Sequence, residues 1–162
     1  MVQAVSRQKE AVIWTSFVVM VPIFLWLGYQ LSPVVIEDLP MWHIVGFLVL
    51  AIILALIPIV VGEVPLFLAQ GVSLAALLSF GLFIEMIVTL VSVLALMAYM
   101  RITSDNRLRI PINMLMFSGI SLIAGFVFYL LGGTPGDTRL LNIGVITPIL
   151  AHEFVYFTLN TV

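Results

Sequence analysis

Cysteine is absent from this sequence, and charged residues are scarce. Without thiols, disulfides, thiolate catalysis, iron–sulfur clusters and cysteine-ligated zinc sites are excluded. Only 9% of the 162 residues are charged, whereas a typical soluble domain carries about 25%. The formal net charge is −2, so the charge balance gives no general reason to expect nucleic acid or anionic lipid as a partner.

Hydrophobic residues, in contrast, make up 63% of the chain. A soluble fold of this size could not bury so much apolar surface, and the excess is expected to face lipid. Several apolar runs reach the ~20 residues needed to cross a hydrocarbon core. The sequence therefore predicts an all-α polytopic membrane helix bundle that forms a single domain over residues 1–162 and has the lipid bilayer as its main partner.

Six spans can be placed along the chain. The first, Ala11 to Leu31, is too long for the apolar region of a signal peptide, and no cleavage site follows it. The second runs from Met41 to about Val61, where the prolines and glycine of "IPIVVGEVP" should break a helix. The fifth and sixth are predicted at about Ile112 to Leu131 and Leu140 to Val162.

The remaining run, Leu66 to Met100, needs to be divided. As one helix it would be roughly 52 Å long at ~1.5 Å per residue, which is too long for one span. Positive loops usually stay in the cytoplasm, and a break near Gly81 puts the arginines of "RITSDNRLR" on the same side as Arg7 and Lys9. This predicts two short or tilted helices, six spans, and cytoplasmic N- and C-termini. A re-entrant first half, over residues 66–81, is the alternative.

Polar residues recur at helical spacing inside these runs, where residues three or four apart share a face. In "SFGLFIEMIV" and the residues after it, Gly81, Glu85, Thr89 and Ser92 share one face. The last run carries a longer stripe: Gly144, Pro148, His152, Tyr156 and Asn160, with Glu153 beside it. The other runs add Gln70, Ser73, Asn113, Ser118, Ser121 and Gly125. Such faces are expected where helices pack on each other or on a cavity.

The predicted site residues, which would line a polar interior and contact a small ligand, are Glu85, Gln70, Ser73, Thr89, His152, Glu153 and Tyr156. A charged side chain exposed to lipid at mid-membrane costs about 2.5–3.5 kcal/mol on insertion scales, so Glu85 should face the bundle interior. Two interpretations of Glu85 stay open. It contacts a ligand, proton or cation, or it is a hydrogen-bonded strut between helices.

His152 and Glu153 begin the zincin pattern H-E-x-x-H, but position 156 is tyrosine and His43 is the only other histidine. We therefore expect no metal and no cofactor. The pair is expected near the cytoplasmic end of the last span. No nucleophile, base and oxyanion donor can be assembled from the sequence, so we expect no catalytic residues and no enzymatic activity.

The run "VPLFLAQGVSLAALLSFGLFIEMIVTLVSVLALMAYM", followed by "RIPINMLMFSGISLIAGFVFYLLGG", resembles the N-terminal membrane input domains of certain bacterial signalling proteins. In those proteins a multi-pass module in the inner membrane precedes a cytoplasmic GGDEF diguanylate cyclase domain. The resemblance covers roughly residues 41 to 135. It implies a sensor that relays a signal to an output domain absent from this chain, with a homodimer or that output domain as partner.

Two other classes of function stay open. The S components of energy-coupling-factor transporters are also six-span proteins and use an A-x-x-x-A pattern in their first helix, whereas "AIILA" (Ala51 and Ala55) lies here in the second span. A membrane scaffold of a cell-envelope complex would need only lateral partners. The final run is apolar to its last residue, "FVYFTLNTV", which fits either a fragment truncated at its C-terminus or a chain that ends there.

Overall fold

The computed structural model describes residues 2–32, 41–57, 59–61, 64–66, 68–99, 108–136 and 143–160. Within these residues the chain is helical apart from turns and one short antiparallel strand pair, which confirms the predicted all-α class. The helices are α1 (Val2–Leu31), α2 (Met41–Ala55), α3 (Ala69–Phe80), α4 (Leu82–Tyr99), α5 (Arg109–Leu130) and α6 (Ile143–Asn160). The strands are β1 (Ile59–Val61) and β2 (Val64–Leu66), with Val60 opposite Pro65.

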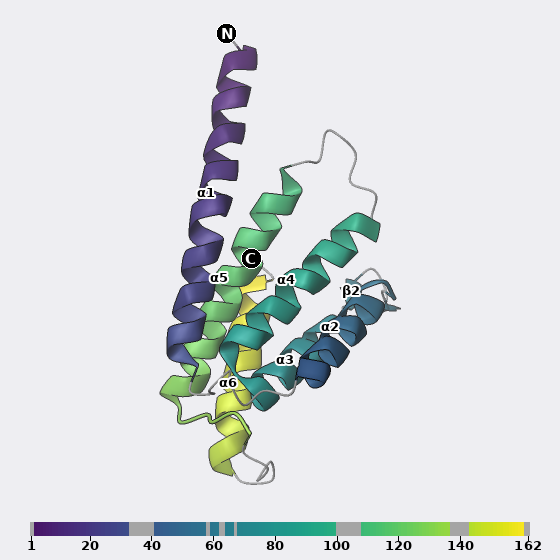
Figure 1. Ribbon diagram of the computed structural model, residues 1–162, viewed down its shortest axis with the longest axis vertical. Helices are drawn as coiled ribbons and strands as arrows, with labels where there is room; N and C mark the ends of the chain where they lie inside the picture. The colour runs from purple at the N-terminus through teal and green to yellow at the C-terminus, as the bar shows by residue number, and fades with distance from the viewer. Residues whose placement is uncertain are drawn as a thin grey trace.

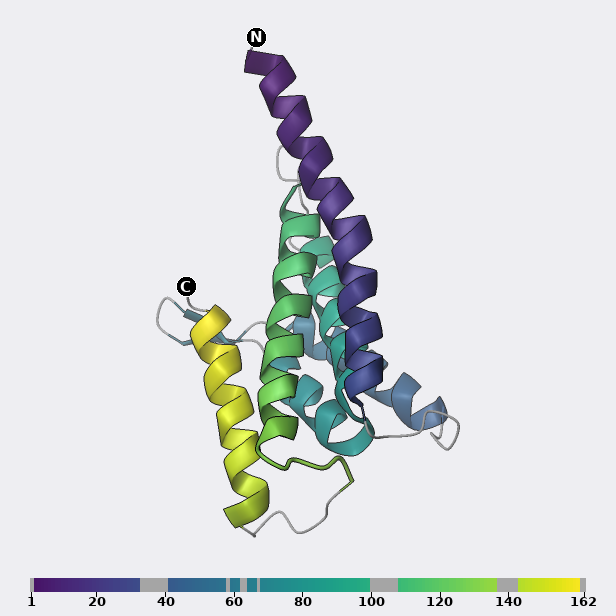
Figure 2. The same ribbon diagram turned by 90° about the vertical axis from the view of Figure 1, so that its left-hand side faces the viewer.

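The helices form an up-and-down bundle. The long helices α1, α4 and α5 lie side by side, and the start of α1 lies at the same end of the bundle as the start of α5 (Figures 1 and 2). The shorter α2 and α3 pack on each other and on α4, and the strand pair joins them about halfway along the height of α4 (Figure 1). On the opposite side α6 lies against α5 (Figure 2).

The distribution of side chains differs from that in a water-soluble protein. Large apolar side chains are exposed along most helices, including Trp26, Val49, Leu94, Leu130 and Phe154. The interior is mainly apolar as well, but it also holds a set of buried polar side chains: Ser73, Glu85, Thr89, Ser92, Ser118, Ser121 and His152. Three helices of the described part, over Arg7–Leu31, Leu82–Tyr99 and Arg109–Leu130, are long and apolar enough to cross a membrane. This architecture fits a protein embedded in a membrane.

The second predicted span is wrong in its length. The helix was predicted to reach about Val61, but α2 ends at Ala55 and Ile59–Val61 form a strand. Pro58 disfavours helical geometry in the residue before it, and the β-branched residues that follow suit a strand. At ~1.5 Å per residue, α2 and α3 are roughly 22 and 18 Å long, shorter than a ~30 Å hydrocarbon core. Six complete spans therefore stay a prediction, as does the re-entrant alternative over residues 66–81.

The predicted break at Gly81 is confirmed. The chain leaves α3 at Phe80 and enters α4 at Leu82, and Gly81 has φ 92°, a value that side chains with a Cβ rarely adopt. The Gly81 amide donates to the Leu77 carbonyl at 2.9 Å, while the Leu82 amide donates to the Tyr129 hydroxyl at 3.1 Å. The reversal is therefore hydrogen-bonded on both sides, and it places α4 back against α3.

Close packing of α4 on α5 depends on a second glycine. A Cβ on Gly125 would lie 2.8 Å from Leu82 Cδ2, and Leu82 is fully buried. Phe128, one turn further along α5, packs with Leu77 and Met86 in the same cluster. The small residue at position 125 thus lets the two helices approach until the polar face of α4 meets α5.

Candidate functional site

The candidate site is built around the carboxylate of Glu85, in the first turn of α4. Glu85 is fully buried, and Thr89 and Ser92 follow it on the same face at 4% and 7% exposure. This is the polar face that helical spacing predicts. Ser92 bonds to its own helix, donating to the Val88 carbonyl at 2.7 Å, whereas Thr89 turns toward its neighbours on other helices.

Three hydroxyl groups from three helices surround the carboxylate. Thr89 on α4 and Ser121 on α5 both donate to Glu85 Oε1, at 3.1 and 3.0 Å. Ser73 on α3 is hydrogen-bonded to the Thr89 hydroxyl. One carboxylate oxygen is thus held by a chain of hydroxyls that joins α3, α4 and α5, as buried polar groups require.

Helix α6 completes the cluster with an imidazole and a phenol. His152 is fully buried and lies near Glu85. The Tyr156 hydroxyl lies within hydrogen-bonding reach of Thr89 and Ser121, and its ring centroid is 6.0 Å from that of His152. Four helices therefore meet at one polar centre inside an otherwise apolar bundle.

Two atoms of this centre have no hydrogen-bond partner among the described residues: Glu85 Oε2 and His152 Nε2. The other imidazole nitrogen, Nδ1, donates to Glu153 Oε1 at 3.1 Å. In a neutral imidazole held this way, Nε2 is left as an acceptor. A buried polar atom without a partner is destabilising. Each of these two buried atoms can therefore accept a further hydrogen bond.

Within the described residues, α6 packs on fewer helices than any other helix of the bundle does. Within the described residues it packs chiefly on α5, and Figure 2 shows it standing at the side of the bundle. His152 and Tyr156 are the buried side chains of α6 that lie toward α4. These two side chains therefore join α6 to the polar centre.

The structure brings together most of the predicted site residues: Glu85, Ser73, Thr89, His152 and Tyr156. Gln70 lies one turn before Ser73 and is half-buried, and no described contact joins it to the cluster. Glu153 touches the cluster only through His152 and is 36% exposed. Ser121 is absent from the predicted site, although the polar face predicted for its helix includes it. Spacing identifies a face but does not say which hydroxyl reaches the carboxylate.

The predicted position of the His152–Glu153 pair near the cytoplasmic end of the last span stays a prediction, and the structure shows how the two side chains are placed in the bundle. His152 lies in the middle of α6 and is fully buried against the cluster, because its position in the i+4 stripe turns it inward while Glu153 turns outward. No group of three or more histidine, aspartate or glutamate side chains in the described part of the chain is placed to hold a metal ion.

Comparison with known proteins places this arrangement in no established family. No family model matches the chain, and neither a curated protein nor a solved structure is significantly similar to it.

Proposed function

We propose that this protein is the membrane-embedded input module of a bacterial signal-transduction protein, and that the Glu85 cluster receives the signal. The observation that carries the proposal is the presence of two fully buried polar atoms, Glu85 Oε2 and His152 Nε2, that have no hydrogen-bond partner among the described residues and lie in the polar centre where α6 meets α4. If Glu85 and His152 had only a structural role, hydrogen-bond partners for both atoms would make the fold more stable, since an unpaired buried polar group is destabilising.

The relay follows from how α6 is held. A ligand or proton that binds between Glu85 and His152 changes the strength of the contact between α4 and α6. Because α6 otherwise packs chiefly on α5 within the described residues, its contact with α4 is the one that such binding would alter. An output domain that follows α6 in the cytoplasm would receive that change.

The orientation in the bacterial inner membrane is part of the proposal. The start of α1, which carries Arg7 and Lys9, lies at the same end of the bundle as Arg109 at the start of α5 (Figure 1). Basic residues favour the cytoplasmic side. We propose that this end is cytoplasmic and that the turn at 131–136 faces outward. Helix α6 then returns the C-terminus toward the cytoplasm.

Single-cysteine labelling tests this orientation, because the natural chain has no cysteine. Lys9→Cys and Arg109→Cys are expected to react with a membrane-impermeant maleimide only in inverted vesicles. Thr134→Cys is expected to react in intact spheroplasts. All three positions are exposed in the structure. Labelling of Arg109→Cys from outside would overturn the orientation.

The sensor function is tested in the native host. An immunoblot with an antibody against residues 101–109 is expected to detect a species much larger than 17.9 kDa, with the output domain in the added mass. A chromosomal Glu85→Gln allele is then expected to change the activity of that domain about tenfold or more at an unchanged protein level, as for the loss of a charged hydrogen-bonding group at a recognition site. A band at 17.9 kDa would overturn the sensor proposal.

The alanine pair of the second span gives no support to the transporter S component. Ala51 and Ala55 of "AIILA" are buried at 0% and 2% exposure, and Ala51 packs against Val72 and Ala76 of α3. A pair used for internal packing is not available to grip a partner. The scaffold alternative needs no polar centre, so the buried cluster does not favour it.

A further inference from the structure

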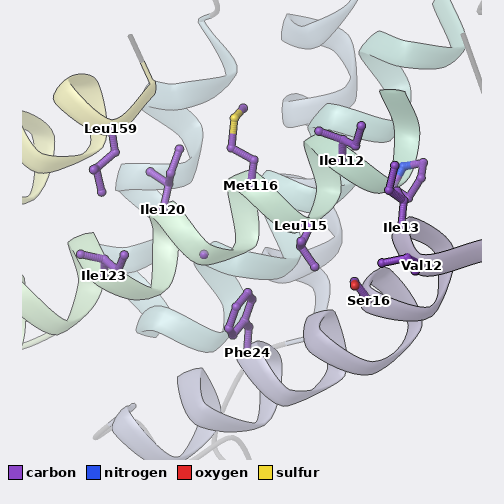
Figure 3. Close-up of a pocket in the computed structure, with 12 residues that line it drawn as sticks. Val12, Ile13, Ser16, Phe24, Ile112, Leu115, Met116, Ile120, Ile123 and Leu159 are labelled. Atoms are coloured by element: carbon purple, nitrogen blue, oxygen red, sulfur yellow. The ribbon is translucent and has the colours of Figure 1, made fainter. Parts of the chain in front are cut away.

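An apolar groove runs along the side of the bundle, away from the Glu85 cluster. It has a volume of about 570 Å³ and is lined by α1 and α5, with Leu159 of α6 at one end (Figure 3). Ser16 is the one polar side chain among its lining residues. Phe24 and Gly119 both line it, and a Cβ on Gly119 would lie 3.6 Å from the Phe24 ring.

The position of the groove restricts what it can hold. Both α1 and α5 are long and apolar enough to cross a membrane, so the groove lies at hydrocarbon depth. Its lining offers almost no hydrogen-bonding groups, so its occupant must be apolar along its length. A lipid acyl chain or an apolar helix meets that requirement.

The charged residues near the groove distinguish a lipid from an apolar helix as its occupant. Lys9 precedes the lining residues Ile13 and Ser16 by one and two turns of α1, and Arg109 stands in the same relation to Ile112 and Met116 on α5. Both cations are exposed. Two positive charges from different helices therefore stand at the end of the bundle where α1 and α5 begin, and one carboxylate, Glu10, lies beside Lys9.

We propose that this groove is a binding site for an anionic phospholipid, with one acyl chain in the groove and the phosphate headgroup between Lys9 and Arg109. Basic pockets between transmembrane helices suit anionic headgroups, because each cation near the surface attracts them. The site is independent of the signal-receiving role proposed for Glu85.

A second copy of this chain fits the groove less well. In a parallel twofold dimer formed through this face, Lys9 and Arg109 would approach their own counterparts, and like charges repel. Close helix contacts in membranes also favour a seam of small residues, whereas Leu115, Met116 and Ile120 border the single glycine, Gly119.

The test is native mass spectrometry of the purified full chain in detergent, titrated with phosphatidylglycerol or phosphatidylcholine of identical acyl chains. The wild type is expected to retain phosphatidylglycerol preferentially. Lys9→Gln and Arg109→Gln should each weaken its binding about fivefold, and the double variant about 25-fold. Arg7→Gln is the matched control, because Arg7 shares its face with Ala11 and Trp14, which do not line the groove.

A second pair of variants tests the acyl-chain part. Gly119→Leu fills the groove floor and is expected to abolish retention of both lipids. Gly71→Leu adds the same side chain at an exposed position on α3 with nothing nearby and should leave binding unchanged.

Equal retention of the two lipids by the wild type would overturn the headgroup site. An equal loss in Arg7→Gln would show general attraction in place of a site. A dimer that Gly119→Leu dissociates would assign the groove to a second copy instead.

Discussion

Replacement of Glu85 by alanine is expected to lower the free energy of unfolding by about 3 kcal/mol. The alanine removes the acceptor for the Thr89 and Ser121 hydroxyls and leaves both donors buried without it. It also opens a cavity at a site with no exposure. Glu85→Gln keeps an acceptor oxygen and the side-chain volume, so its loss should stay within about 1 kcal/mol.

Denaturant titration in detergent, followed by circular dichroism, measures these differences. Ser92→Ala is the matched control on the same helix face. Its hydroxyl donates to the Val88 carbonyl and lies outside the cluster, so we expect a change below about 1 kcal/mol. A Glu85→Ala variant as stable as the wild type would show that the hydroxyls do not depend on the carboxylate.

The comparison of the two Glu85 variants also separates the two interpretations of this carboxylate. If Glu85 receives the signal, Glu85→Gln retains the fold and loses the response of the output domain. If Glu85 is only a strut, both variants change the response in proportion to the stability they lose. The glutamine variant is therefore the informative one for function, and the alanine variant for structure.

Removal of the imidazole at position 152 is expected to loosen α6. His152→Ala leaves a cavity where a fully buried ring stood and removes the group that faces Glu85 from α6, with a loss of stability of about 3 kcal/mol. Because α6 packs chiefly on α5, the loss should appear as increased motion of this helix against α2 and α4.

Spin labels test the movement directly in the cysteine-free chain. Labels at Val49→Cys on α2 and Phe154→Cys on α6, both exposed positions, report the distance between the two sides of the bundle. His152→Ala should broaden the double electron–electron resonance distance distribution. Glu153→Gln is the control, because Glu153 is 36% exposed and bonds only to the outer nitrogen of the ring. An unchanged distribution in His152→Ala would mean that α5 alone positions α6.

Composition and helical spacing determined much of this protein. A chain that is 63% hydrophobic and 9% charged has too little polar surface to cover a soluble fold, which led directly to an all-α class with lipid outside. Glycine at position 81 in a run too long for one span marked the reversal between α3 and α4. The i+4 spacing also placed Glu85 and Thr89 on one inward face.

Tertiary contacts decided the rest. A helical stripe shows which residues share a face, but the rotation of α6 and its packing on α5 decide that His152 meets Glu85. The same limit explains why Ser121 joins the cluster while Gln70 has no described contact with it. Hydropathy reports how apolar a segment is and not how the segment folds. It therefore could not distinguish complete spans from the short helices α2 and α3, which are joined by a strand pair. Side-chain packing between helices distant in sequence is set by the whole bundle and by no local pattern.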